Sequence, residues 1–88
     1  MRFHKGYILC DICGENALLP NGKEGVELTG MLHLNETAAE VFRHFSDKDF
    51  EEEDIAKFLF ENYDVEESTA REGAARLTEA FSAFDAFD

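Results

Sequence analysis

The chain has 88 residues and a mass of 10.0 kDa, which leaves room for one small domain. Apolar residues make up 44% and charged residues 32%, a composition typical of a globular protein rather than a disordered or fibrous one. No run approaches the roughly 18 apolar residues of a membrane-spanning helix. The amino-terminal residues also lack the apolar stretch and cleavage site of a signal peptide. We therefore expect a single cytoplasmic domain over residues 1–88.

Charge is unevenly distributed along the chain, whose formal net charge is −12. Residues 1–34 hold three bases and four acids, whereas residues 35–88 hold five bases and sixteen acids. A polyanion binds proteins mainly through Lys and Arg, so the second part would repel a phosphate-rich partner. The sequence therefore argues against binding to nucleic acid or to an acidic membrane surface.

The first part of the chain has the pattern of three short antiparallel strands. Residues 7–13 are rich in apolar and β-favouring side chains, and Gly14 can form a turn after them. Residues 16–19 are a second apolar run, which stops at an Asn-Gly turn signal. Residues 27–34 alternate well enough to predict a third strand, in which Gly30 suggests a bulge or a close backbone approach.

The next part predicts two helices. Over residues 36–45, apolar side chains recur at the i, i+3, i+4, i+7 spacing of one buried stripe, and Asn35 is a suitable N-cap. Over residues 51–63, an acidic run at residues 51–54 stands where the helix macrodipole favours negative charge.

A third helix is predicted over residues 68–84, where apolar residues recur at steps of four, three, four and three. Either Ser68 or a capping box of Thr69 and Glu72 would begin this helix. Gly73 interrupts it, and a glycine inside a helix costs about 1 kcal/mol relative to alanine. This glycine either allows a close approach by a strand or peptide, or it only weakens the helix.

Three strands followed by three helices predict an α+β domain with its helices on one face of the sheet, an arrangement similar to a winged helix. Most winged helices bind DNA with a basic recognition helix. Here the last helix carries Arg71 and Arg76 against three nearby acids, so the usual ligand of that fold does not suit this charge.

Several segments of the chain resemble the PqqD-like family. The most specific of them is Leu34-Asn35-Glu36-Thr37-Ala38, at the junction of the third strand and the first helix. The resemblance covers nearly the whole chain, and its further segments are Gly6-Tyr7-Ile8-Leu9, Ile12-x-Gly14-Glu15, Leu18-x-Pro20 and Glu61-Asn62-Tyr63-Asp64-Val65.

The resemblance implies a non-catalytic peptide-binding domain from pathways that make ribosomally synthesised and post-translationally modified peptides (RiPPs). Such a domain holds the leader of a precursor peptide and presents it to a modifying enzyme, often a radical SAM protein. In the family the leader adds as an extra strand to the edge of the third strand, beside the last helix.

A free strand edge is physically suited to this role, because its unpaired N–H and C=O groups can template an extended peptide. Carried over to this chain, the strand edge would be Leu28, Thr29, Gly30, Met31, Leu32 and His33. The wall on the last helix would be Ala70, Ala74, Leu77 and Phe81, with Arg71 and Glu72 as charges at its rim.

We expect neither enzymatic activity nor a cofactor. The sequence has no phosphate-binding glycine loop, no serine-nucleophile motif and no His pair spaced for one face of a helix. On an extended strand, Cys10 and Cys13 would have Cα atoms about 10 Å apart, whereas a disulfide needs about 7 Å or less. Zinc would need two further ligands, so two free thiols are the expectation.

The acidic helical part leaves a second hypothesis open. In it, the chain is an adaptor that binds a basic protein through its helices rather than through the sheet edge. An exposed edge can also pair with its own copy, so a monomer or a weak dimer is expected.

Overall fold

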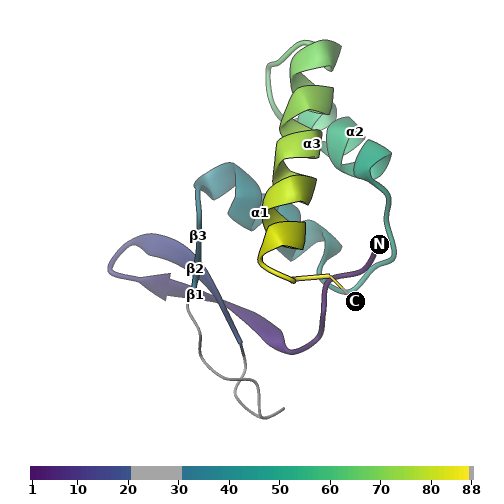
Figure 1. Ribbon diagram of the computed structural model, residues 1–88. Helices are drawn as coiled ribbons and strands as arrows, with labels where there is room; N and C mark the ends of the chain where they lie inside the picture. Colours follow the sequence, from purple (N-terminus) through teal and green to yellow (C-terminus); the bar gives the residue numbers. More distant parts are fainter. Residues whose placement is uncertain (21–30, 88) are drawn as a thin grey trace.

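The computed structural model describes residues 1–20 and 31–87, whose arrangement is shown in Figure 1. In this part of the chain, three strands form one antiparallel sheet in the order β1-β2-β3, and three helices follow. The elements are β1 (Tyr7–Ile12), β2 (Glu15–Pro20), β3 (Leu32–Leu34), α1 (Glu36–Phe45), α2 (Glu52–Asn62) and α3 (Glu67–Ala83). The predicted α+β fold is confirmed, and five of the six elements lie within about two residues of their predicted bounds.

The first two strands form a tight hairpin. Ile12 pairs with Glu15, so the loop consists of Cys13 and Gly14 alone. Both loop residues have positive φ, 54° and 84°, the combination that suits a two-residue turn to the twist of its strands. The Asp11 carboxylate accepts the Gly14 N–H at 3.0 Å and steadies the turn. The prediction that β1 reaches Cys13 is therefore wrong, because this residue belongs to the turn.

The third strand passes directly into α1. Leu32–Leu34 pairs with β2, whereas residues 27–30 of the predicted strand lie outside the described residues. Asn35 is the N-cap of α1, as predicted, and its side-chain oxygen accepts the Ala38 N–H at 2.8 Å. A single residue therefore separates the edge strand from the helix, which holds the two elements at a defined angle.

The start of α3 differs from the prediction. The helix begins at Glu67, and its N-cap is Glu66, with extended backbone and no capping bond from its side chain. Ser68 and Thr69 already lie inside the first turn, so neither caps the helix as expected. The acidic side chain at the first helical position is favoured by the macrodipole, which supplies a start signal one residue before Ser68 and two before Thr69.

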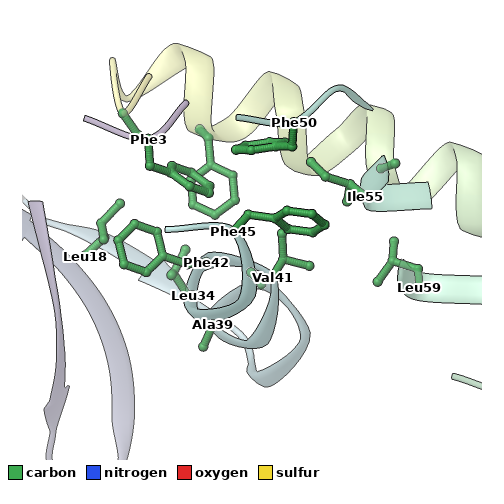
Figure 2. Packing of buried hydrophobic residues seen from close by; sticks show 14 of the residues in the cluster. Phe3, Leu18, Leu34, Ala39, Val41, Phe42, Phe45, Phe50, Ile55 and Leu59 are labelled. Atoms are coloured by element: carbon green, nitrogen blue, oxygen red, sulfur yellow. The ribbon is translucent and has the colours of Figure 1, made fainter. Parts of the chain in front are cut away.

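The core is built largely from phenylalanine rings. Phe3 is 1% exposed, and its ring centroid lies 4.8 Å from that of Phe42, 4.9 Å from that of Phe81 and 5.3 Å from that of Phe50. These rings come from the amino-terminal segment, α1, α3 and the α1–α2 loop. Figure 2 shows the labelled rings gathered between the sheet residues on one side and α2 on the other.

The two ends of the described chain lie side by side. The Phe3 backbone forms an isolated antiparallel bridge with Phe87, and the His4 N–H donates to the Ala86 carbonyl at 2.7 Å. Figure 1 shows both ends on the same side of the helical layer. The segments before β1 and after α3 thereby close the core over Phe81.

The last two helices pack closely against each other. A Cβ added at Gly73 would lie 3.3 Å from Cδ1 of Leu59, so the missing side chain lets α3 approach α2. The close approach is therefore made by a helix, rather than by a strand or peptide. No helix within residues 1–20 and 31–87 has the length and apolar character needed to cross a membrane.

Candidate functional site

The third strand is an edge of the sheet. It pairs with β2 through Leu18–Leu32, Ala17–His33 and Asn16–Leu34, and within the described residues its other side has no strand partner. Backbone N–H and C=O groups on that side are available to a further strand. The edge is short, since its described part spans three residues.

A hollow of about 260 Å³ runs beside this edge, between β3 and the carboxyl-terminal half of α3. We call it the β3–α3 groove. Its strand side is formed by Leu32, His33 and Leu34, and its helix side by Arg76, Leu77, Ala80 and Phe81, with Asn35 and Ala38 at the junction with α1.

The floor of the β3–α3 groove is apolar and rigidly supported. Phe81 and Ala38 are almost fully buried, at 1% and 4% exposure, and both belong to the core cluster. Leu32 and Leu77 are half-buried, so they form walls with apolar surface still open to solvent. The groove thus joins unpaired backbone groups to an apolar hollow, the two features needed to hold an extended peptide.

The predicted strand residues fall into two groups. Leu28, Thr29 and Gly30 lie outside the described residues. Met31 is 43% exposed just before β3 and does not line the groove, whereas Leu32 and His33 do.

The predicted helix residues divide at the middle of α3. Leu77 and Phe81 line the β3–α3 groove. Ala70, Arg71 and Ala74 instead line hollows along the seam between α2 and α3, together with Ala56. The stripe is continuous in sequence, but α2 covers its first half and the sheet approaches only its second half. Glu72 remains near the groove through a bond to the Arg76 guanidinium.

Sequence reasoning missed five residues of the groove: Leu34, Asn35, Ala38, Arg76 and Ala80. Arg76 and Ala80 are four residues apart, so they form a second stripe next to Leu77 and Phe81. That spacing could have identified them, but the exposed face of an amphipathic helix has the same pattern. Only the position of the sheet distinguishes the two.

The charge of the groove differs from that of the molecule around it. Of the lining residues that the structure describes, Arg76 is the one with a formal charge, in a protein whose net charge is −12. Its guanidinium donates to the Glu72 carboxylate at 3.2 Å, and both side chains are well exposed. His33 lines the strand side of the groove, and its Nδ1 lies 3.9 Å from the Glu15 carboxylate.

The two cysteines take no part in this groove. Both are free, with Cys10 half-buried on β1 and Cys13 exposed in the hairpin turn. Within the described part of the chain, no three His, Cys, Asp or Glu side chains are grouped so as to hold a metal ion.

Two solved structures share this fold. The structure described as TbiB1 in complex with the TbiA(beta) leader peptide matches with a TM-score of 0.72 and 15% identity, over 100% of this chain and 95% of that one. The lasso peptide synthetase B1 complexed with the leader peptide matches with a TM-score of 0.66 and 24% identity, over 93% of this chain and 89% of that one. No curated protein matches the sequence.

A family model also matches the sequence directly. The model is described as coenzyme PQQ synthesis protein D (PqqD), and its match extends over residues 16–83. These residues include β2, β3 and all three described helices, and with them every residue that lines the β3–α3 groove. The chain therefore belongs to the PqqD family.

Proposed function

We propose that this protein is a leader-peptide-binding domain of a RiPP pathway, which captures a precursor peptide by strand addition at β3 and presents it to a modifying enzyme. Family membership supports the proposal, and both structural relatives are described as complexes with leader peptides. The observation that carries it is that the β3 edge, within the described residues, has no second strand partner and lies beside an apolar groove.

Strand addition and side-chain burial must act together in this binding mode. Each backbone hydrogen bond at the β3 edge contributes about 0.5–1.5 kcal/mol net. Burying one large apolar side chain over Leu77 and Phe81 adds about 1.5–3 kcal/mol. Ordering the leader costs about 2–5 kcal/mol, so neither the backbone pairing nor the side-chain burial is enough to hold the leader by itself.

The domain acts by binding and needs no cofactor of its own. Its partners are the precursor peptide and a modifying enzyme, for which a radical SAM protein is the proposed class. It works in the cytoplasm, where precursor peptides are synthesised, and it is a monomer or a weak dimer.

The first test locates the peptide by NMR. The ¹⁵N-labelled domain is titrated with a synthetic leader peptide from a precursor encoded beside its gene. Backbone amides of residues 31–34 and 76–81 should shift. Shifts confined to the acidic surface of residues 47–67 would instead support an adaptor for a basic partner and overturn leader capture in the groove.

The second test asks whether the leader adds as a strand. Because alternate amides of an added strand point toward β3, the leader is synthesised with single N-methyl groups at successive positions. Methylation at every second residue should weaken binding at least about tenfold, which is 1.4 kcal/mol, and methylation of the intervening amides should change it little. Equal effects at all positions would contradict strand addition while leaving leader binding intact.

A further inference from the structure

The β3–α3 groove combines the positive charge of Arg76 with an apolar floor, and this combination affects which peptide sequences it can bind. Arg76 stands at the rim of the groove, and Leu77 and Phe81 form the helix side of its hollow. Among the described residues no carboxylate lines the hollow, although sixteen acids lie in residues 35–88. This rim is therefore a place where the molecule offers a peptide carboxylate an attractive charge.

The ion pair between Arg76 and Glu72 is weak enough for Arg76 to bind a different carboxylate. Its bond to Glu72 joins two side chains that are 78% and 66% exposed, and exposed pairs one helical turn apart are weak. A peptide carboxylate in the groove would meet the same guanidinium next to apolar walls, where solvent screens the interaction less. Exchanging one acid for the other thus costs little and strengthens the pair.

The spacing of the groove residues sets the spacing of the peptide. Arg76 and Ala80 share a face of α3 and are separated by a rise of about 6 Å. Alternate side chains of a strand, which point to the same face, are about 6.8 Å apart. A peptide strand laid along β3 can therefore place an apolar side chain beside Ala80 and Phe81 and, two residues away, a carboxylate at Arg76.

Resting on the function proposed above, we propose that Arg76 is a specificity-determining residue. It selects leaders in which an Asp or Glu stands two residues from a large apolar residue. The preference is for that position alone, because the net charge of −12 disfavours acids elsewhere in the bound peptide. Leaders that match are thus acidic at this point and neutral or basic around it.

The same helix provides a matched control. Arg71 donates to Glu67 at 3.0 Å with the same four-residue spacing as Arg76 and Glu72, and it is similarly exposed. It lines the seam between α2 and α3 and not the β3–α3 groove. Like Arg76→Glu, Arg71→Glu therefore changes the net charge and breaks a helical ion pair. It does so outside the β3–α3 groove.

The experiment selects binders from an mRNA-display library of random 15-residue peptides on the parent domain, Arg76→Glu and Arg71→Glu. The parent and Arg71→Glu should enrich an acid two residues from Leu, Ile or Phe. Arg76→Glu should enrich Lys or Arg at that position. Replacing the selected acid by Ala should weaken binding to the parent about three- to tenfold and leave binding to Arg76→Glu unweakened.

The outcomes separate this inference from the proposed function. If the selected peptides shift the amides of residues 31–34 and 76–81 but show no acid at a fixed spacing, the groove binds peptides and the role of Arg76 is wrong. The same conclusion follows if Arg76→Glu enriches the parental acid. If the selected peptides shift other residues only, leader capture at β3 fails as well. Circular dichroism of each variant verifies that it is folded.

Discussion

At the scale of single residues, Asn35 connects the edge strand to the helical part. It follows the last residue of β3, lines the β3–α3 groove and caps α1 through the Ala38 N–H. A side-chain oxygen at this position satisfies one of the amides that a helix start leaves unpaired. The orientation of the β3 edge relative to α1 thus depends on a short polar side chain.

Removing this cap should lower stability by a modest and measurable amount. For Asn35→Ala we expect the free energy of unfolding to fall by about 1 kcal/mol, because the Ala38 N–H loses its partner. Urea denaturation followed by circular dichroism measures the change. Asn35→Asp keeps an acceptor at the helix start and should remain within about 0.5 kcal/mol of the parent. Equal losses in the two variants would show that the cap is not the cause.

At the scale of elements, the apolar face of α3 packs against α2 in its first half and lies beside β3 in its second half. Its first half packs on α2, where Ala70 and Ala74 are buried and Gly73 allows the helices to approach. Its second half forms a wall of the β3–α3 groove through Leu77 and Phe81. Because α2 holds the first half in place, the groove has a fixed wall opposite a short strand. The helix therefore connects the packing on α2 to the wall of the groove beside β3.

The tight contact at Gly73 should reduce the benefit of a better helix former. Gly73→Ala gains about 1 kcal/mol in helix propensity but brings a Cβ to 3.3 Å from Leu59, so we expect a net gain well below that value. Ala75→Gly, at an exposed position two residues later, should lose the full amount of about 1 kcal/mol. Thermal and urea denaturation measure both changes. A gain at Gly73 as large as the loss at Ala75 would mean that the close contact has no energetic effect.

At the scale of the whole molecule, one aromatic cluster joins the two terminal segments to the helical part. Phe3 contacts rings from α1, the α1–α2 loop, α3 and the carboxyl-terminal segment. The charge has the opposite distribution, since the acids of residues 35–88 lie mainly on exposed helical surfaces, while residues 1–34 have three bases and four acids. The stability of the fold therefore depends on apolar packing at its centre, whereas the surface charge affects solubility and the kind of partner that can bind.

Truncating the central ring should destabilise the domain severely. Phe3→Ala should cost about 3–5 kcal/mol, a large part of the about 5–15 kcal/mol that stabilises a typical domain. Phe60 is 51% exposed on α2, so Phe60→Ala should cost less than about 1 kcal/mol and is the matched control. Urea denaturation of both variants compares them. Similar losses would contradict the central place of Phe3 in the core.

Local patterns predicted most of the elements because their causes are local. The α1 stripe, the Asn35 cap and the hairpin around Gly14 each depend on residues within one or two turns of chain. The prediction failed where two local signals competed. At the start of α3 the acidic residues prevailed over Ser68 and Thr69, and at the end of β1 the turn took Cys13 from the strand.

The sequence by itself determined the order of strands and helices, the acidic character of the helical part and the presence of an apolar stripe on α3, because periodicity and charge are written along the chain. Only the tertiary structure decided which half of that stripe faces the sheet. It brought Arg76 and Ala80 to β3 and placed Ala70 and Ala74 against α2. The reason is physical: a helical stripe specifies that one face is buried, whereas the partner of each turn depends on contacts between segments far apart in the chain.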